Sequence, residues 1–359
     1  MDTMPAVALQ EEAEFWITSD LAGPRAVDVS VVIPTYNAGA TLERAVRSAL
    51  DQSLGDIEVI VVDDASRDFS WNLVGDLLIE DARIRGIRNK QNQGKPVGMN
   101  RAIALARGRW IAVLDADDWF ERDRLATLIA LGERQQVDMV ADNQSFHDAL
   151  AGQMVGTAWP SRAKGWGAQE WALTFDDFLL GSDAYDTFSF GMLKPVMRRD
   201  FIRRTGLGYE AGARNGHDFF YLLQFFLQGG KAAICDRPLY CYTQPFGAVS
   251  RQWSNASRRR YDFQTACDIN RRYLAAALGF LTSSQAARLE CRNRRLECLE
   301  YYYCAKERLA ASDLPGASAL ILEHPAIFGY LLRSLSRRYL NRPGSAAVQR
   351  VAKRARAAP

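Results

Sequence analysis

The stretch Trp110-Ile111-Ala112-Val113-Leu114-Asp115-Ala116-Asp117-Asp118 is the most informative part of this 359-residue chain. Its apolar run predicts a buried strand, of the kind that parallel sheets contain. Three carboxylates follow within four residues, at the end of the strand where open α/β sheets bind ligands. Clustered carboxylates repel one another unless a cation lies among them, and a hard divalent ion shared with substrate phosphates fits this role. The alternative is a turn in which Asp117 or Asp118 caps a helix that starts near Glu121.

Strand and helix patterns alternate on the amino-terminal side of this stretch. Apolar, β-branched runs predict strands over 29–34, 57–62, 84–87 and 110–114. Helices are predicted between them, over about 42–50, 70–80 and 96–106. This alternation predicts a parallel sheet with right-handed crossovers. Polar residues follow every strand, at 36–37, 63–64, 89–92 and 115–118. Because parallel strands end at one edge of a sheet, these residues are expected to form one site.

The pattern changes after about residue 135. Strands are predicted over 139–146 and 188–197, and over 233–242 with a break at Pro238. An apolar helix is predicted over 218–228, and mostly helical sequence from 254 onward. We therefore divide the chain into a leader or short extra helix (1–27), a first α/β half (28–140), a second half of mixed pattern (141–250) and a helical, basic C-terminal region (251–359).

Composition is that of a globular protein, with 48% apolar and 24% charged residues and a net charge of +3, which gives no reason to expect nucleic-acid binding. No apolar run approaches the roughly 18 to 20 residues of a membrane span. The acidic N-terminus is not a signal peptide. The six cysteines form no Cys-x-x-Cys pair, and Cys291, Cys298 and Cys304 share a helix face, which favours core packing in a reducing, cytoplasmic compartment.

The C-terminal region has an uneven charge distribution. No acidic residue follows Glu323, whereas arginines and lysines recur among leucines and tyrosines up to residue 356. Such a segment can lie on an anionic membrane surface. A solvated basic helix or a disordered end explains the composition equally well.

Four motifs carry a family resemblance. The chain lacks both Gly-x-Gly-x-x-Gly and a Walker A sequence. It contains Val31-Val32-Ile33-Pro34-Thr35-Tyr36-Asn37, Val61-Val62-Asp63-Asp64-Ala65-Ser66, Asn92-Gln93-Gly94 with Asn100, and Leu114-Asp115-Ala116-Asp117-Asp118. In this order and at this spacing, over roughly 28–140, they resemble the family 2 glycosyltransferases. The resemblance implies the GT-A fold, a Rossmann-like, mostly parallel sheet flanked by helices. It also implies that 28–140 is the nucleotide-sugar-binding half and that 141–250 is the acceptor-binding and catalytic-base half.

The resemblance implies that Pro34 and Tyr36 line the nucleoside pocket. Asp64, with Asp63 behind it, resembles the carboxylate that binds the base, and an ionised carboxylate, which only accepts hydrogen bonds, suits a pyrimidine N–H. For Asp63, a buried structural role at the strand end is the alternative.

Asn92, Gly94 and Asn100 correspond to positions that contact nucleotide or sugar, and turn or helix-start roles remain open for them.

The same resemblance assigns the metal. Asp117 corresponds to the residue that holds Mg²⁺ or Mn²⁺, and Asp115 to one that reaches ribose or metal. The ion would neutralise the departing nucleoside diphosphate. Asp118 is expected to cap the next helix or to support its neighbours. Lys95 is an accessory candidate beside the diphosphate, with a solvated lysine as the alternative.

The catalytic base is expected about 100 residues later, where the family commonly has a Glu-Asp pair at the start of a helix. In the stretch 214–220, Asp218 takes the Asp position and His217 replaces Glu. A helix N-terminus stabilises an ionised carboxylate there, which suits a general base, and a plain N-cap is the alternative. His217 is an accessory candidate that tunes Asp218 or touches the acceptor. Arg251 is another, in a loop over the diphosphate.

The sequence therefore predicts a cytoplasmic, metal-dependent inverting glycosyltransferase. It would move one sugar from a nucleotide-diphosphate donor, UDP-linked, to a hydroxyl of a glycan acceptor. The expected acceptor is a lipid-linked oligosaccharide of bacterial exopolysaccharide or surface-polysaccharide synthesis, met at the inner face of the membrane. The alternatives are a sugar-1-phosphate nucleotidyltransferase, although residues 35–40 lack the basic, Gly-rich loop it needs, and a non-catalytic binding subunit, which the histidine at position 217 keeps open.

Overall fold

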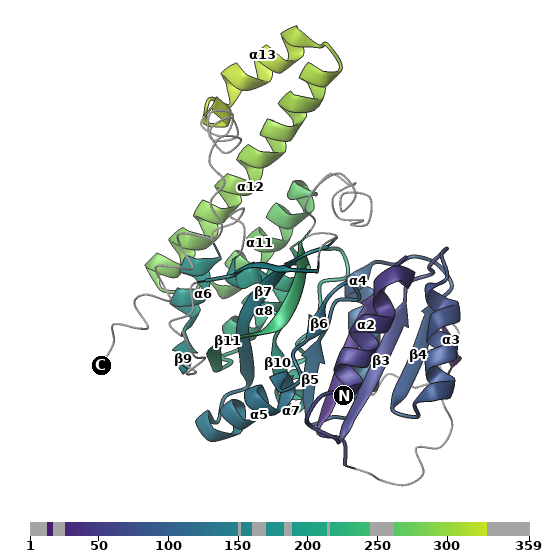
Figure 1. Ribbon diagram of the computed structural model, residues 1–359. Coiled ribbons are helices and arrows are strands. Elements are labelled where there is room, and N and C mark those ends of the chain that lie inside the picture. The colour runs from purple at the N-terminus through teal and green to yellow at the C-terminus, as the bar shows by residue number, and fades with distance from the viewer. Residues whose placement is uncertain are drawn as a thin grey trace.

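The computed structural model describes residues 13–16, 26–149, 152–159, 170–182, 189–213, 216–244 and 262–328. Figure 1 shows a twisted sheet with helices on both sides and a helical arm that projects from it. The strands are β1 (Ala13–Trp16), β2 (Val29–Thr35), β3 (Ile57–Asp63), β4 (Ile84–Asn89), β5 (Trp110–Val113), β6 (Trp119–Phe120), β7 (Met139–Asp148), β8 (Met154–Thr157), β9 (Glu170–Leu173), β10 (Val196–Arg198) and β11 (Ala232–Gln244).

The helices alternate with these strands in the first half and dominate the end of the described chain. They are α2 (Gly39–Leu50), α3 (Ser70–Glu80), α4 (Lys95–Leu105), α5 (Arg124–Gln135), α6 (Phe175–Gly181), a 3₁₀ turn η1 (Phe190–Met192), α7 (Arg199–Thr205), α8 (His217–Leu227), α11 (Phe263–Ala277), α12 (Ser283–Ala310) and α13 (Leu314–Glu323).

The sheet has the order β1-β4-β3-β2-β5-β10-β7-β11-β6, with β8 beside β7 and β9 beside β11. Strands β4, β3, β2 and β5 run parallel, as predicted, so their carboxyl ends lie at one edge. The short β10 is antiparallel to both neighbours and joins β5 to β7. The second half of the chain thus continues the sheet of the first, giving a mostly parallel, mixed sheet with the predicted helical region after it.

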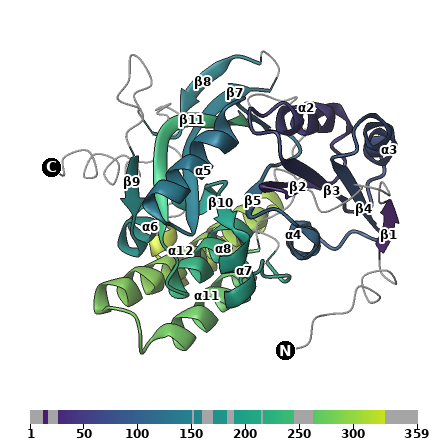
Figure 2. The ribbon, with the colours of Figure 1, turned by 90° about the horizontal axis from the view of Figure 1, so that it is seen from below.

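Two cores lie on opposite faces of the sheet. Val31 and Ile33 of β2 point into a core with α2, α3 and α5, whereas Val32 points into a second core with α4, α7, α8 and α11. Figure 2 shows these two groups of helices on opposite sides of the strands. Burial on both faces explains why these strands appear in the sequence as continuous apolar runs.

Several predicted elements were wrong in detail. Within 1–27, where a leader or extra helix was expected, Ala13–Trp16 form β1, which pairs antiparallel with β4, and residues 1–12 and 17–25 lie outside the described residues. Within 188–197, the described residues form η1 and the three-residue β10. The helix expected near Glu121 begins at Arg124 after Asp123, because β6 intervenes and pairs with β11. Asp117 and Asp118 therefore do not cap it.

The break predicted at Pro238 is a register shift within one long strand, β11, which pairs in parallel with β7. A proline lacks the N–H that a regular ladder requires, so the shift falls where the ladder loses a donor.

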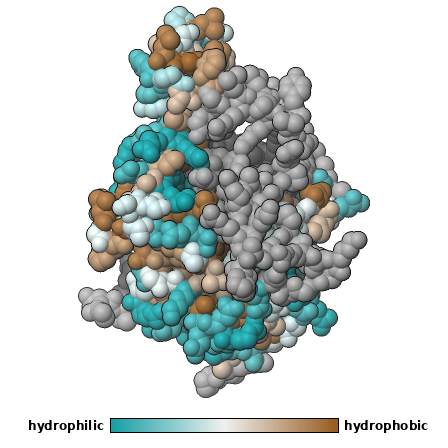
Figure 3. Space-filling view, turned by 90° about the vertical axis from the view of Figure 1, so that its left-hand side faces the viewer, coloured by the Kyte–Doolittle hydropathy of each residue, from teal (hydrophilic) through white to brown (hydrophobic). Residues whose placement is uncertain are grey.

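The C-terminal helices form an arm. Helices α12 and α13 make a hairpin that extends away from the sheet (Figure 1), and Thr282 with Gln285 closes the start of α12 as a capping box. Exposed apolar side chains gather at the far end of the arm, among them Leu314, Leu322 and Phe328, and Figure 3 shows an apolar patch there. Among the described residues, no helix is both long and apolar enough to cross a membrane. The basic segment that follows lies outside the described residues.

Candidate functional site

The loop after β4 is held by the carboxylate of Asp64. Its Oδ1 accepts hydrogen bonds from Asn89 Nδ2 and the Gln93 N–H, both at 2.8 Å, and its Oδ2 accepts the Gly94 N–H at 2.8 Å. Gly94 has φ +89°, a left-handed conformation that favours glycine. The carboxylate thus uses three of about four acceptor positions within the protein. Asp64 fixes the loop that leads directly into Lys95.

The loops after β2 and β3 are joined in the same way. The N–H of Asn37 donates to Ser66 Oγ at 2.9 Å, and Asn37 Oδ1 accepts the Arg67 N–H at 2.8 Å. Pro34 and Tyr36 lie half-buried beside this junction. The carboxyl ends of β2 and β3 and the loops that follow them are therefore joined at one edge of the sheet, as the sequence predicts.

Two predicted donor-binding residues make contacts within the protein. Asp63 is buried, with Oδ2 accepting the Ser66 N–H at 3.1 Å and lying 3.4 Å from Arg88 Nε. Asn100 lies within α4, where its Nδ2 donates to the Tyr209 carbonyl and its Oδ1 accepts the Tyr209 N–H, both at 2.8 Å. Asp63 braces the end of β3, and Asn100 joins α4 to the segment before α8.

Asn92 remains exposed, and its Nδ2 donates to the Asp64 carbonyl at 3.3 Å.

Two carboxylates and two ammonium groups meet at the centre of this edge. Lys194 Nζ lies 2.8 Å from Asp115 Oδ2 and 2.7 Å from Asp218 Oδ2. Lys95 Nζ lies 2.6 Å from Asp115 Oδ1 and 3.7 Å from Asp218 Oδ1. Asp115 comes from the end of β5 and Asp218 from the first turn of α8, so the two lysines join the predicted donor side to the predicted base.

These contacts set the protonation states. Burial by itself would raise the pKa of Asp115, but the ammonium groups of Lys194 and Lys95 outweigh burial and lower that pKa to about 2. The same balance holds the pKa of Asp218 still further below its ordinary value. The two carboxylates in turn keep the pKa of Lys194 well above its ordinary value despite its burial. Both carboxylates and Lys194 are therefore charged at neutral pH.

Asp218 is not a cap of α8. The N-cap position belongs to Gly216, and Asp218 lies in the first turn with its side chain directed to Lys194. Its neighbour His217 has Nε2 3.6 Å from Asp218 Oδ1. Burial lowers the pKa of His217 to about 4, more than the nearby carboxylate raises it, so the imidazole is neutral at pH 7. His217 is a half-buried neighbour of Asp218, not a surface residue.

The carboxylate of Asp118 is hydrogen-bonded to β11, in the second half of the chain. Its Oδ2 accepts the Tyr240 hydroxyl at 2.7 Å, and its Oδ1 accepts the Thr243 N–H at 2.8 Å. The Tyr240 oxygen also accepts the Asp115 N–H at 3.1 Å. Burial, followed by the charges of Asp117 and Asp115, raises the pKa of Asp118 well above its ordinary value. Asp118 supports its neighbours, one of the two roles predicted for it.

Asp117 is exposed, and its carboxylate forms no hydrogen bond or ion pair with another residue of the described chain. No group of three or more His, Cys, Asp or Glu residues placed to hold a metal occurs among the described residues. Mg²⁺ is typically held by one or two carboxylates together with substrate phosphates and water. Asp117 fits that donor set, whereas Asp115 is engaged by two lysines.

Lys194 is the site residue that sequence reasoning missed. It stands in the run Met192-Leu193-Lys194-Pro195-Val196, and its side chain is 5% exposed. A charged residue inside an apolar run is a usable signal, because buried charges require partners. Arg251, the remaining accessory candidate, lies outside the described residues.

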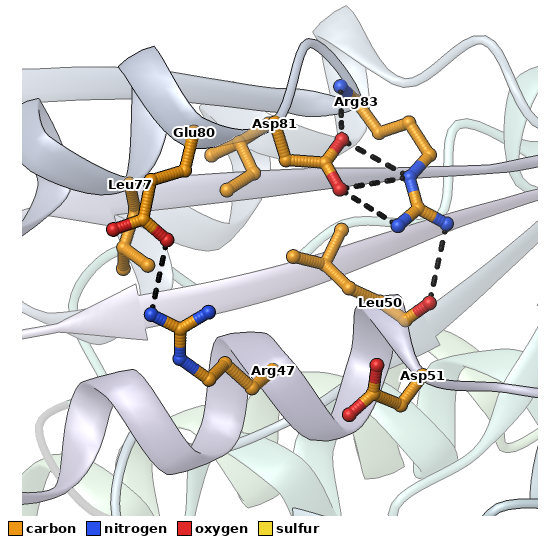
Figure 4. Close-up of a pocket in the computed structure, with 8 residues that line it drawn as sticks. Arg47, Leu50, Asp51, Leu77, Glu80, Asp81 and Arg83 are labelled. Carbon is orange, nitrogen blue, oxygen red and sulfur yellow. Dashed lines mark hydrogen bonds and ion pairs between the residues drawn. The ribbon is translucent and has the colours of Figure 1, made fainter.

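A separate hollow lies at the opposite edge of the sheet, between the end of α2 and α3 (Figure 4). Arg47 Nη2 lies 3.0 Å from Glu80 Oε2, and Arg83 Nη2 lies 2.7 Å from Asp81 Oδ2. Four of the charges that line this hollow are therefore paired with one another, and none of the predicted site residues lies in it.

Solved structures share this fold. S. aureus TarS 1-349 in complex with UDP-GlcNAc has a TM-score of 0.57 at 15% identity, covering 73% of this chain and 70% of that one. The mannosyltransferase PcManGT from Pyrobaculum calidifontis, in complex with GDP-Man and Mn²⁺, has a TM-score of 0.51 at 17% identity, covering 88% and 87%. At these identities the likeness establishes the fold, which is the predicted GT-A arrangement.

Sequence relatives extend over much of the chain. Succinoglycan biosynthesis protein ExoO from Rhizobium meliloti is 33% identical over 62% of this chain. The matched region spans 63% of the length of ExoO. ExoU of the same organism is 30% identical over 70% of each chain. The Escherichia coli UDP-Glc:alpha-D-GlcNAc-diphosphoundecaprenol beta-1,3-glucosyltransferase WfaP is 37% identical over 30% of this chain and 43% of its own length. Residues 30–195 match the family described as Glycosyl transferase family 2. The chain belongs to glycosyl transferase family 2.

Proposed function

We propose that this glycosyltransferase moves one sugar from a UDP-linked donor to an acceptor hydroxyl with inversion, using Asp218 as the base. The observation that carries the proposal is the link through Lys194, which holds Asp218 Oδ2 and Asp115 Oδ2 within 2.8 Å of one ammonium group. The base candidate is thereby fixed beside the strand ends that form the donor edge. The family assignment leaves the nucleotidyltransferase alternative without support.

The geometry of Asp218 suits a general base. Its Oδ1 is buried but has no hydrogen-bond partner among the described residues, while Oδ2 is anchored by Lys194. A base must lie within hydrogen-bond reach of the proton that it removes, and an open carboxylate oxygen provides that contact. In an inverting transfer the acceptor hydroxyl would donate to Oδ1 as it attacks the sugar, while the diphosphate leaves from the opposite side.

Asp64 and the loops after β2 and β3 would form the nucleoside part of the donor site. Asp64 Oδ2 accepts one hydrogen bond within the protein, from Gly94, and so retains capacity for a ring N–H. Pro34 and Tyr36 lie beside that loop. The UDP-GlcNAc complex of TarS, which has this fold, supports a uridine nucleotide.

Asp117 would hold a divalent cation, Mg²⁺ or Mn²⁺. When bound with the donor, such an ion neutralises charge on the leaving diphosphate. The exposed carboxylate of Asp117 offers a protein ligand, and the Mn²⁺ complex of PcManGT supports a cation in this fold. Arg44 Nη2 donates to the Asp117 carbonyl at 2.6 Å and so fixes the backbone of this residue.

The acceptor would be a lipid-linked oligosaccharide of exopolysaccharide or surface-polysaccharide synthesis, used at the cytoplasmic face of the membrane. The succinoglycan relatives and the diphosphoundecaprenol-linked acceptor in the name of WfaP support this acceptor class. The basic segment after Glu323 and the apolar side chains at the end of the arm would contact the membrane surface.

The donor and metal roles are tested by assaying transfer and UDP release with a panel of nucleotide sugars, with and without Mn²⁺. The wild-type chain is expected to require the cation and to prefer a UDP sugar. Asp117→Ala should lose most cation-dependent turnover, and Asp123→Ala, at the start of α5, serves as the matched control. Cation-independent transfer by Asp117→Ala at the wild-type rate would contradict the metal role, and donor binding by the wild-type chain without any turnover would favour a binding subunit.

Inversion is tested by NMR of the first product formed, before mutarotation or further reaction. The anomeric configuration is expected to be opposite to that of the donor. Retention of configuration would contradict a single displacement assisted by Asp218.

Membrane contact is tested by flotation of the full chain with vesicles of anionic or zwitterionic lipid. Binding is expected only with anionic vesicles, and Leu314→Glu with Leu322→Glu should weaken it. Equal recovery with both vesicle types, or none with either, would contradict the surface contact.

A further inference from the structure

Lys194 is a buried cation with two anionic partners. Its side chain is 5% exposed, and its Nζ makes hydrogen bonds or ion pairs to Asp115 Oδ2 and Asp218 Oδ2. A buried ammonium group is stable only when it is paired in this way. The two partners come from different halves of the chain, so Lys194 fixes the distance between the donor edge and the first turn of α8.

The backbone of Lys194 is itself held rigidly. Arg124 Nη2 donates to the Lys194 carbonyl, and Arg124 forms a fully buried ion pair with Asp142, with Nη2 to Oδ1 at 2.8 Å. Gln144 Nε2 donates to the Met192 carbonyl at 3.1 Å, two residues before Lys194. Strand β7 thus supports this segment through two side chains, and little movement of Lys194 is expected.

Lys95 has a different setting. Its side chain is 22% exposed, at the start of α4, and its one short contact is with Asp115 Oδ1 at 2.6 Å. The distance to Asp218 Oδ1 is 3.7 Å, which is an ion pair without a hydrogen bond. A lysine is a flexible chain with a compact charge, so Lys95 can turn to another anion at small cost.

A base that is paired with two ammonium groups is a weak acceptor of protons. Transfer therefore requires that part of this positive charge be drawn away from Asp218 when the donor is bound. The donor brings a diphosphate, which is the anion best able to attract an ammonium group from the edge. Of the two lysines, only Lys95 is exposed enough to make this exchange.

We propose that Lys194 is a fixed positioning residue that spans Asp115 and Asp218, and that Lys95 is an exchangeable cation that leaves these carboxylates for the donor diphosphate. Donor binding would thereby free Asp218 Oδ1 for the acceptor hydroxyl, while Lys194 keeps Oδ2 in place. The inference rests on the proposed role of Asp218 as base. It predicts that the two lysines affect different kinetic constants.

The test uses the full chain with Lys194→Met, Lys95→Met and, as the matched control, Lys231→Met, whose side chain is exposed outside the site. Lys194→Met is expected to lower kcat by about a hundredfold, the effect of misplacing a reacting group by about 1 Å, with UDP affinity nearly unchanged. Lys95→Met is expected to weaken UDP binding roughly tenfold, as a lost exposed phosphate contact would. Lys231→Met should match the wild type in both.

Chemical rescue separates positioning from general structure. In Lys194→Ala, propylammonium added to the assay should restore part of kcat, whereas propanol of the same size should not. If Lys194→Met does not fold, Lys194→Met with Asp115→Asn removes one of the two uncompensated charges. Its kcat should lie about a hundredfold below that of a folded Asp115→Asn single variant. Thermal unfolding midpoints identify the folded variants.

Three results would overturn the inference. These are a Lys194→Met kcat equal to that of Lys231→Met, unchanged UDP affinity in Lys95→Met, and equal rescue by propanol and propylammonium. If instead Asp218→Asn retains wild-type transfer, it is the proposed base that fails. Inactive Asp218→Asn together with fully active Lys194→Met would overturn this inference and leave the proposed base in place.

Discussion

The carboxylates at the two edges of the sheet differ in how completely they are paired with hydrogen-bond donors. At the amino edge, where the parallel strands begin, Glu58 of β3 accepts hydrogen bonds from the Ser30 hydroxyl at 2.6 Å and the Arg107 N–H at 2.7 Å. Its Oε2 lies 2.9 Å from Arg107 Nη2. At the carboxyl edge, the Asp218 Oδ1 has no hydrogen-bond partner among the described residues, and Asp117 is exposed. The Glu58 carboxylate therefore has its partners within the protein, whereas the carboxyl edge has carboxylate oxygens that can still accept hydrogen bonds.

This difference distinguishes a structural charge from a functional one. Although burial alone would raise the pKa of Glu58, the hydrogen bonds from Ser30 and Arg107 lower it, so its charge stabilises the fold. The carboxyl edge also holds its charges, through ion pairs that outweigh the effect of burial, but it keeps the acceptor oxygen that a base requires. Substitutions at the amino edge should therefore change stability, and those at the carboxyl edge should change turnover.

The largest stability effect is expected between the two edges, at the Arg124–Asp142 pair. Both side chains are fully buried. Arg124→Met should lower the free energy of unfolding by roughly 3 to 5 kcal/mol, because it leaves the Asp142 carboxylate uncompensated. Denaturant unfolding measures the loss. Arg124→Met with Asp142→Leu should recover much of it, and an equally unstable double variant would contradict this account of the pair.

A smaller stability effect is expected at the amino edge. Glu58→Gln should lower the free energy of unfolding by roughly 1 to 3 kcal/mol, because charge-assisted hydrogen bonds weaken while the partly exposed Arg107 can regain water. The kcat of the folded enzyme should remain at the wild-type value. A large fall in kcat without loss of stability would erase the distinction between the edges.

At the carboxyl edge, Tyr240→Phe should reduce stability only by about 1 kcal/mol, the net value of a typical hydrogen bond. The Tyr240 hydroxyl donates to Asp118 and accepts the Asp115 N–H, so its loss loosens the backbone that carries the metal-side carboxylates. Cation-dependent turnover should fall clearly, although the free energy of unfolding changes little. Titration of transfer against Mn²⁺ gives this comparison, and unchanged cation dependence would count against it.

A further effect concerns pH. His217 has a folded pKa of about 4 against an ordinary value of 6.5, so between these values the unfolded chain binds the extra proton. Its contribution to stability is present above pH 6.5 and is lost as pH falls toward 4. His217→Asn should therefore flatten the decline of unfolding free energy between about pH 7 and about pH 5. An unchanged slope would show that His217 is not kept neutral by the fold.

The donor edge was predictable because its signals are local. Each strand of the first half is followed at once by its polar residues, as at Asp64 and Asp115, and parallel pairing brings those ends together. The contacts that complete the site are long-range: Asp118 and Tyr240 are 122 positions apart. No local pattern predicts that Asp118 binds Tyr240 in place of capping a helix. Lys194 was missed for the same reason, since its partners are defined only by the packing of β10 and α8.

The central claim is that Asp218 acts as the base at the open edge, and Asp218→Asn tests it most directly when compared with Glu58→Gln. We expect Asp218→Asn to lower kcat by about 10² to 10⁴, the usual contribution of a general base, while UDP binding stays near the wild-type value. Glu58→Gln should retain kcat. Near-normal transfer by Asp218→Asn with the true donor and acceptor would contradict the account.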